Sequence, residues 1–113
     1  MKMNDRYLCK AKNLDTGKWT VWNIFAGLYG ANIDRTTLCQ CTGLKDKNGK
    51  LIWENDIVNS ENGKAVVVWD RAEWRIKWIK DTIWRKDLYF WTNDDDWKCE
   101  VIGNIFDNDE RFI

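Results

Sequence analysis

Histidine and proline are both absent from this sequence of 113 residues. Histidine is the side chain that most often transfers protons near neutral pH, so the usual acid or base of hydrolytic and transfer enzymes is missing. A cysteine nucleophile would need a strongly lowered thiol pKa, which Lys10 or Lys98 would provide only weakly. The composition therefore predicts a protein that is not an enzyme and that needs no cofactor.

Long apolar segments are also missing. No stretch approaches the roughly 20 apolar residues that span a bilayer, and the first residues, MKMNDRYLCKAK, lack the apolar region of a secretory signal. The 18 basic and 18 acidic side chains give a formal net charge of zero, so no overall field favours a membrane or a nucleic acid. We expect a soluble, cytoplasmic protein with no membrane partner.

The chain has four cysteines, and a cytoplasmic location predicts free thiols. Cys39 and Cys41 are separated by one residue, whereas structural zinc sites usually place two to four residues between such ligands. Cys9 and Cys99 are far apart in the sequence. Residues 94–96 are three aspartates without the glycine and glutamate of a calcium loop. No metal is predicted, although zinc held by four thiolates that a sheet brings together stays an alternative.

Tryptophan, in contrast, is abundant. Burial of an aromatic side chain removes roughly 150–250 Å² from water, so an exposed indole is costly unless it serves a purpose. A domain of this size buries only about two thirds of the surface of its unfolded chain. Some indoles are therefore predicted to line a groove or a subunit interface. The nine tryptophans are Trp19, Trp22, Trp53, Trp69, Trp74, Trp78, Trp84, Trp91 and Trp97.

Short alternations of apolar and polar residues favour a mainly β protein with antiparallel strands. Residues 7–12 and 18–24 flank a turn at Gly17 and predict an N-terminal hairpin. Residues 25–37 have no clear period and predict a loop or a short helical turn, and residues 81–91 predict a hairpin or a short helix. The other predicted strands cover residues 38–41, 51–53, 57–58, 65–69, 74–78 and 100–106.

Glycine marks several turns. The pairs Asn48-Gly49 and Asn62-Gly63 predict hairpin turns, because both residue types accept a positive φ. Gly103, inside the last predicted strand, indicates a bulge or a close approach of another segment. Residues 107–113 predict a terminal helical turn.

Alternation also places several tryptophans. Trp74, Ile76 and Trp78 alternate with charged residues over six positions, which is the period of a strand with one buried face. Trp69 ends an apolar run that is typical of a buried strand. We therefore predict that Trp69, Trp53 and one face of the Trp74–Trp78 strand belong to the core.

Two segments resemble a known family. Residues 42–58, TGLKDKNGKLIWENDIV, and residues 100–105, EVIGNI, are similar in order and spacing to motifs of the YopX family of small phage and prophage proteins. The resemblance runs from Leu38 onward. It implies an SH3-like β-barrel of the roll type over residues 38–113, preceded by an N-terminal region with a β-hairpin and a linker over residues 1–37.

The resemblance brings no catalytic residues. Where the family usually has glycine before Asp56, this chain has Asn55. Asparagine is the non-glycine residue that best tolerates the left-handed region, so the turn is expected to survive. The Asp56 side chain can accept hydrogen bonds within this turn. We interpret the motif as a folding device.

Charge is uneven in the second half of the chain. Residues 71–86 carry six basic and two acidic side chains, whereas residues 87–110 carry eight acidic side chains and one lysine. Aromatic residues interleave with the basic ones, and the bases of a nucleotide or a single strand can stack on such rings while cations contact phosphates. The neighbouring acids would repel a long nucleic acid, and core packing is the simpler role for most of these rings.

Small size, missing catalytic groups and abundant tryptophan and arginine favour a binding protein. Together with the resemblance, they suggest a phage or prophage accessory protein that binds a host protein, such as a defence or replication component, and inhibits or redirects it. The alternative is binding of a nucleotide or a single-stranded nucleic acid in an aromatic-lined site. With either function, the chain can also form a homo-oligomer that covers the surplus aromatic residues. The candidate binding residues are Trp19, Trp22, Arg75, Lys77, Trp84, Arg85, Trp91 and Trp97.

Overall fold

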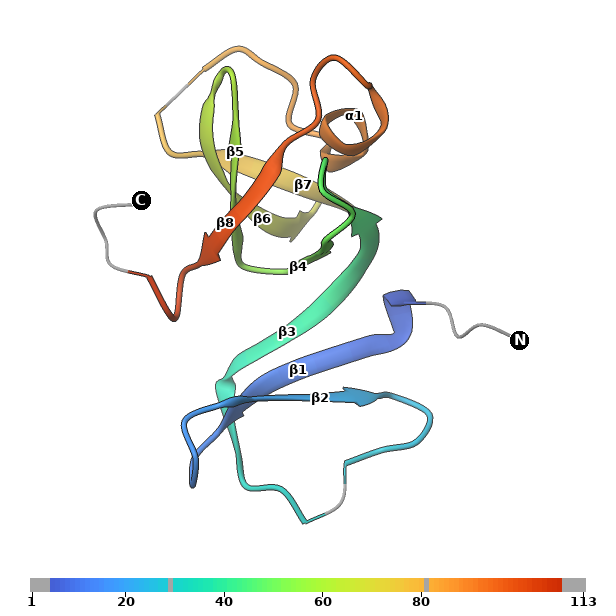
Figure 1. Cartoon of the computed structure of the whole chain (residues 1–113), viewed down its shortest axis with the longest axis vertical. Coiled ribbons are helices and arrows are strands. Elements are labelled where there is room, and N and C mark those ends of the chain that lie inside the picture. The colour runs from blue at the N-terminus through green and yellow to red at the C-terminus, as the bar shows by residue number, and fades with distance from the viewer. Residues whose placement is uncertain (1–4, 29, 81, 109–113) are drawn as a thin grey trace.

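The computed structural model describes residues 5–28, 30–80 and 82–108, which form two antiparallel sheets and one short helix (Figure 1). The mainly β prediction is confirmed. The strand order is β2-β1-β3-β4 in the first sheet and β7-β6-β5-β8 in the second. No helix in this part of the chain is long and apolar enough to cross a membrane. After a 3₁₀ turn at Asp5–Tyr7, the elements are β1 (Leu8–Asn13), β2 (Trp19–Asn23), β3 (Ile33–Lys45), β4 (Leu51–Trp53), β5 (Asp56–Ser60), β6 (Gly63–Asp70), β7 (Glu73–Trp78), α1 (Leu88–Asn93) and β8 (Glu100–Asn104).

β1 and β2 form the predicted N-terminal hairpin. Lys12 lies opposite Trp19 in its register. The Asn13 side chain holds the turn, because its Oδ1 accepts the backbone N–H of Asp15 at 2.8 Å. Gly17 supplies the positive φ that the turn needs, at 71°. The hairpin prediction is therefore confirmed.

β3 connects the two parts of the molecule. It pairs with β1 near its start and with β4 near its end, and Figure 1 shows it crossing from the lower part to the upper part. It begins at Ile33, so the end of the segment 25–37 is strand and not loop. A break in its register against β1 interrupts the regular pairing there. The domain boundary expected between residues 37 and 38 falls inside this strand and stays a prediction.

Tight turns join the strands of the C-terminal body, which we define as β4 to β8, α1 and their loops. Asn55 has a φ of 70° between β4 and β5, as predicted for asparagine in the place of glycine. Arg71 and Ala72 have φ values of 53° and 60° at the tip of the β6–β7 hairpin. A Cβ on Gly103 would lie 2.2 Å from the Asn108 side chain, which confirms the predicted close approach. Residues 109–113 of the predicted terminal turn lie outside the described residues.

A hydrophobic cluster holds the C-terminal body together. Val67 of β6 and Ile76 of β7 are paired in the register and both are buried. Leu88 and Trp91, three positions apart on α1, point to the same side, and Trp91 packs edge to face on Trp78 at a centroid distance of 5.2 Å. The cluster contains Ile52, Val58, Ala65, Val67, Ile76, Trp78, Leu88, Trp91, Cys99 and Val101.

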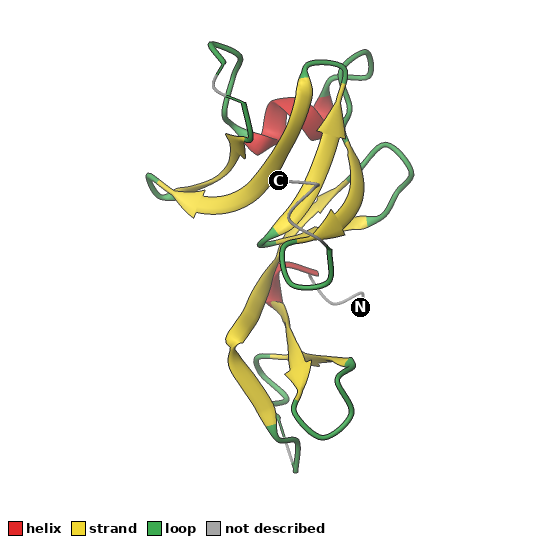
Figure 2. Cartoon of the chain, turned by 90° about the vertical axis from the view of Figure 1, so that its left-hand side faces the viewer, coloured by secondary structure: helices red, strands yellow, loops and turns green. Residues whose placement is uncertain are grey.

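The predicted SH3-like barrel is not confirmed. Among the described residues, the outer strands β7 and β8 of the second sheet do not pair with each other, so this sheet does not close. Figure 2 shows its strands curving, with α1 beside their upper end. The second sheet, which makes up most of the C-terminal body, is therefore open and curved, with a helix packed on it.

Two tryptophan predictions are wrong. Trp69, predicted to be in the core, is 56 % exposed. Its side chain points to the predicted face of β6 and contacts the Trp74 ring at a centroid distance of 5.0 Å. Trp69 lies, however, at the hairpin end of β6, beyond the last core residues of that strand. Trp91, predicted at the surface, is 1 % exposed, because its segment forms α1 and turns this ring inward. Trp78 is buried as predicted, whereas Trp53 is half-buried.

The N-terminal sheet, defined as β1, β2 and the first half of β3, has little core of its own. Its buried apolar side chains are the small ones of Ala11 and Cys39. Val21, and Ile24 and Phe25 just after β2, are each more than half exposed. The hydrophobic cluster of the C-terminal body includes no residue of this sheet. Other contacts must therefore hold the N-terminal sheet in place.

Candidate functional site

Three exposed apolar side chains lie on two neighbouring loops of the C-terminal body. Ile83, which is fully exposed, and Trp84 lie between β7 and α1, and Trp97 lies between α1 and β8. Trp84 and Trp97 are 48 % and 37 % exposed, and their ring centroids are 6.4 Å apart with 31° between the planes. We call Ile83, Trp84 and Trp97 the loop patch. Its two loops are at the upper end of the molecule in Figure 1.

Hydrogen bonds fix the backbone of both loops. The carbonyl oxygen of Arg85 accepts the indole N–H groups of Trp91 at 3.0 Å and of Trp78 at 3.3 Å. In the second loop, the Asp94 carbonyl oxygen accepts the backbone N–H of Trp97 at 3.1 Å. Because two core indoles anchor the residue after Trp84, the loop patch is attached firmly to the core.

Arg85, a predicted binding residue, is already engaged within the chain. Its guanidinium donates two hydrogen bonds of 2.9 Å to the Asp87 carboxylate and lies 4.6 Å from the ring centroid of Phe90. Burial alone would raise the pKa of Asp87, but the hydrogen bond and the charge of Arg85 bring that pKa below its usual value. Arg85 therefore borders the loop patch with its charge paired.

An open depression of about 460 Å³ adjoins Trp97. Its lining is polar and includes Glu61, Asp95, Asp96 and two lysines. One of these, Lys98, lies 3.1 Å from the Asp95 carboxylate. The loop patch is therefore an apolar surface beside a polar, slightly acidic depression.

A second open groove, of about 720 Å³, follows the β6–β7 hairpin. Arg75 and Lys77, two predicted binding residues, line this groove together with Arg71 and Lys86. Trp69 also lines it. The same groove is thus lined by Arg75, Lys77 and a tryptophan that the apolar pattern predicts in the core.

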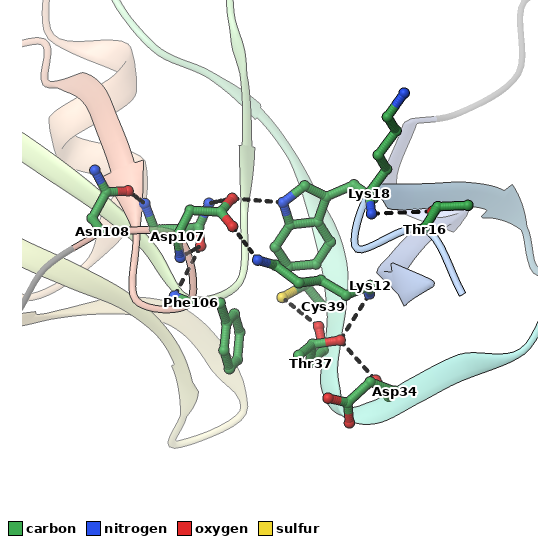
Figure 3. Close-up of polar contacts among 11 residues, drawn as sticks. Lys12, Thr16, Lys18, Asp34, Thr37, Cys39, Phe106, Asp107 and Asn108 are labelled. Atoms are coloured by element: carbon green, nitrogen blue, oxygen red, sulfur yellow. Dashed lines mark hydrogen bonds and ion pairs between the residues drawn. The ribbon is translucent and has the colours of Figure 1, made fainter. Parts of the chain in front are cut away.

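Trp19 takes part in a contact between the N-terminal sheet and the C-terminal body (Figure 3). Its indole N–H donates to the Asp107 carboxylate at 2.7 Å, and its ring lies edge to face against Phe106 at 6.0 Å. The Lys12 ammonium pairs with the same carboxylate, and the Asn104 amide donates to it at 2.9 Å. Burial alone would raise the pKa of Asp107, but these donors lower it to about 2. We call Lys12, Trp19 and Asp107 the Asp107 clamp.

Trp22 belongs to a different surface. It lies three positions after Trp19 on β2, so the two side chains point to opposite faces of the N-terminal sheet. Trp22 is half-buried and lies opposite Cys9 in the register. β2 is at the far end of the molecule from the loops beside α1 (Figure 1), so neither tryptophan joins the loop patch.

The cysteine thiols are free and poorly suited to nucleophilic chemistry. Burial raises the pKa of Cys9, Cys39 and Cys41, and it raises that of Cys99 to about 11. A thiol that stays protonated at neutral pH is a weak nucleophile and a weak metal ligand. Within the ranges that the structure describes, no group of three or more cysteine, aspartate or glutamate side chains is placed to hold a metal ion.

Asp46, inside the motif at residues 42–58, ties a turn to the last strand. One of its carboxylate oxygens accepts the backbone N–H groups of Asn48 and Lys50, both at 2.9 Å. The other accepts the N–H of Val101 in β8, also at 2.9 Å. This carboxylate is buried. It organises the β3–β4 turn and is not available to a ligand.

Asp56, in the same motif, holds the next turn. Its carboxylate accepts the backbone N–H of Trp53 at 2.8 Å. Burial raises the pKa of Asp56 to about 6. The interpretation of this motif as a folding device agrees with these contacts.

Sequence reasoning missed several residues of these surfaces, among them Ile83, Trp69 and Asp107. Ile83 lies in a loop without a period, so no pattern separates an exposed apolar residue from a buried one there. Trp69 follows the core alternation although the core ends before it. Asp107 meets Trp19 across 88 positions of sequence, and no local signal indicates such a pair.

Comparison with known proteins gives a family match. The family model described as YopX protein matches residues 2–112. The match also covers the N-terminal sheet, whereas the motifs that carry the resemblance lie only in the segment from Leu38 onward. No curated protein matches the chain.

Proposed function

Because this chain belongs to the YopX protein family, we propose that it is a small phage-type accessory protein that binds a host protein through the loop patch. Binding alone, without a chemical step, inhibits or redirects that host protein. The observation that supports this proposal is the pair of exposed, neighbouring tryptophans, Trp84 and Trp97, on loops anchored to the core.

The chemistry of the loop patch suits protein binding. Tryptophan is among the residues most enriched at binding hot spots, where single truncations cost about 2 kcal/mol or more. Ile83 adds a fully exposed aliphatic side chain. An anchored loop also loses little conformational freedom on binding, which favours affinity. A polar rim around an apolar centre, such as the depression beside Trp97 supplies, is usual for such interfaces.

A capture experiment tests this proposal. Tagged full-length protein is used to recover host proteins from a lysate, in parallel with a variant that carries Trp84→Ala and Trp97→Ala. We expect at least one host protein to be recovered by the wild type and lost with the double variant. The recovered protein is then purified, and calorimetry is expected to show a loss of affinity of at least tenfold for the double variant.

Trp69→Ala provides the control, because Trp69 is an exposed tryptophan outside the loop patch. It should bind the purified partner as the wild type does. If the double variant and the wild type recover the same proteins with the same affinity, the loop patch is not the binding surface and the proposal is wrong.

Self-association would use the same apolar surface. A second copy of the chain covering the loop patch would make the protein a homo-oligomer, and the partner would then be the chain itself. Light scattering at several protein concentrations distinguishes the two cases. The proposal expects a molecular mass that stays that of a monomer until the host protein is added.

A further inference from the structure

We propose that the groove along the β6–β7 hairpin binds a short stretch of single-stranded nucleic acid, with Trp69 stacking on a base and Arg71, Lys77 and Lys86 contacting phosphates. This groove shares no residue with the loop patch, so the inference goes beyond the proposed function.

The cations of the groove are largely unpaired. Among the described residues, Arg71, Lys77 and Lys86 take part in no ion pair. Arg75 pairs with Glu73 beside the groove. Asp70 is the one acidic residue of the described chain that lines the groove. The groove is therefore locally positive on a chain whose net charge is zero.

Trp69 offers a supported aromatic surface at one end of the groove. Its ring is more than half exposed and leans on Trp74 at a centroid distance of 5.0 Å with 71° between the planes. The second ring restricts the motion of the first. A restrained, exposed indole is a surface on which bases of any sequence stack in single-strand binding proteins. Lys77 lines the same groove from the opposite face of the hairpin.

Asp95 and Asp96 of the acidic segment lie away from this groove, and Asp87, which pairs with Arg75 in an isolated bridge, has its carboxylate held by Arg85. Glu61 precedes β6 and lines the depression beside Asp95 and Asp96, whereas Arg71 follows β6. The 8 residues of β6, at about 3.3 Å each, separate the two ends by roughly 26 Å. That separation exceeds the Debye length of about 10 Å at 0.1 M salt more than twofold. The repulsion expected from Asp95 and Asp96 is therefore largely screened in the fold.

Dimensions limit the ligand to a few nucleotides. The groove volume of about 720 Å³ lies within the range of sites that hold small ligands. A rigid duplex presents its bases stacked inside and offers none to Trp69.

Fluorescence anisotropy of a labelled short oligothymidylate tests the proposal on the full chain. We expect binding whose affinity falls with salt, with a log–log slope of about −2 for three phosphate contacts. Replacement of Arg71, Lys77 and Lys86 together by alanine should lower the affinity at least tenfold and flatten the slope. Trp69→Ala should lower the affinity about tenfold. An oligouridylate is expected to bind in the same way, and a duplex of equal length at least tenfold more weakly.

Two controls decide whether the groove is responsible. A variant with Lys18, Lys45 and Lys50 replaced by alanine removes the same charge from exposed lysines elsewhere and should bind the oligonucleotide as the wild type does. The Trp84→Ala and Trp97→Ala variant should also bind normally, so failure of this site is distinguishable from failure of the loop patch. Three results would overturn the proposal. They are absence of binding by the wild type, an equal loss of affinity in the groove variant and in the variant with the three lysines replaced elsewhere, and equal binding of the duplex.

Discussion

The C-terminal body and the N-terminal sheet are held together by different interactions. The body buries two tryptophan rings, those of Trp78 and Trp91, in one hydrophobic cluster. The N-terminal sheet buries mainly Ala11 and Cys39 and reaches the body through β3 and the Asp107 clamp. Burial of large apolar side chains contributes far more to stability than partly exposed polar contacts do. The body therefore sets the global stability of the chain, and the sheet opens more easily.

Exposed apolar residues in the body and in the N-terminal sheet also differ in how firmly their backbone is attached to a core. Trp84 in the body donates its backbone N–H to the Thr82 hydroxyl oxygen at 3.4 Å and precedes Arg85, whose carbonyl oxygen is bound by two core indoles. Val21 and Phe25 extend from a sheet that lacks such an anchor. The loop patch combines exposure with a firm attachment, and for this reason we assign binding to it.

The largest expected effect comes from Trp91→Ala in the core of the body. Loss of the ring leaves a cavity against Trp78 and removes the hydrogen bond to Arg85, and we expect a loss of about 3–5 kcal/mol in the free energy of unfolding. Urea denaturation followed by circular dichroism measures it. Trp91→Phe keeps an aromatic ring and should cost clearly less. A loss below about 1 kcal/mol for the alanine variant would contradict the view that the core of the body sets the global stability of the chain.

The next effect concerns Asp56, whose pKa burial raises to about 6. Because this pKa lies above the value of about 3.9 in the unfolded chain, the folded state binds the proton more tightly. Its contribution to stability is fully present below about pH 4 and is lost as the pH rises through about 6. Asp56→Asn keeps an acceptor for the Trp53 N–H without the buried charge.

We therefore expect Asp56→Asn to raise the free energy of unfolding by about 2 kcal/mol at pH 8 and to change it little at pH 4. Urea denaturation at both pH values measures this. A variant that is less stable than the wild type at pH 8 would show that the ionised carboxylate is favourable in the fold.

A smaller effect is expected when the Asp107 clamp is removed. Asp107→Ala should lower the global free energy of unfolding by about 1 kcal/mol or less, because the ion pair is partly exposed. Amide exchange in β1 and β2 should nevertheless become faster. Asp15→Ala, in an exposed turn of the same sheet, is the control and should leave exchange unchanged.

The pH dependence of the clamp has the opposite sign to that of Asp56. The Asp107 pKa is lowered to about 2 in the fold, so its contribution is present above about pH 4 and is lost as the pH falls through about 2. Exchange rates in the N-terminal sheet that do not respond to Asp107→Ala would mean that the clamp does not hold the sheet to the body.

The smallest effect is expected at the tip of the β6–β7 hairpin. Arg71 and Ala72 adopt positive φ values, which cost roughly 1–2 kcal/mol for a residue with a side chain. Glycine avoids this cost but loses about 0.5–1 kcal/mol of stability through its greater freedom in the unfolded chain. Ala72→Gly should therefore stabilise the protein by about 0.5 kcal/mol, measured as a higher midpoint of urea unfolding. A lower midpoint would contradict the expectation.

The sequence predicts regular strands well and the edges of the core poorly. The N-terminal hairpin, the left-handed turn at Asn55 and the close approach at Gly103 all depend on neighbouring residues, so local patterns suffice to predict them. Local patterns do not suffice for Trp69 and Trp91. Alternation indicates which face of a strand is buried, but not how far along the strand the core extends, and this decides the exposure of Trp69. For the segment of Trp91 the sequence allows either a hairpin or a short helix. The barrel implied by the family resemblance depends on pairing between distant strands, which no local pattern determines.

The candidate surfaces depend on long-range contacts even more. Trp84 and Trp97 were predicted binding residues, but their proximity arises only because α1 brings two loops together. Arg75 and Lys77 were also predicted, whereas their neighbour Trp69 was not. The role of Trp19 in the Asp107 clamp follows from a contact with the other end of the chain, which composition and spacing do not reveal.

Hydrogen exchange of the intact protein tests the central comparison most directly. The rates of backbone amides in β1 and β2 are compared with those in β5, β6 and β7 as denaturant is increased in the native range. We expect the amides of the body to exchange only through global unfolding, and those of the N-terminal sheet through a smaller opening with a lower free energy. Equal free energies of opening in both regions would contradict the account, because they would mean that the sheet and the body unfold as one unit.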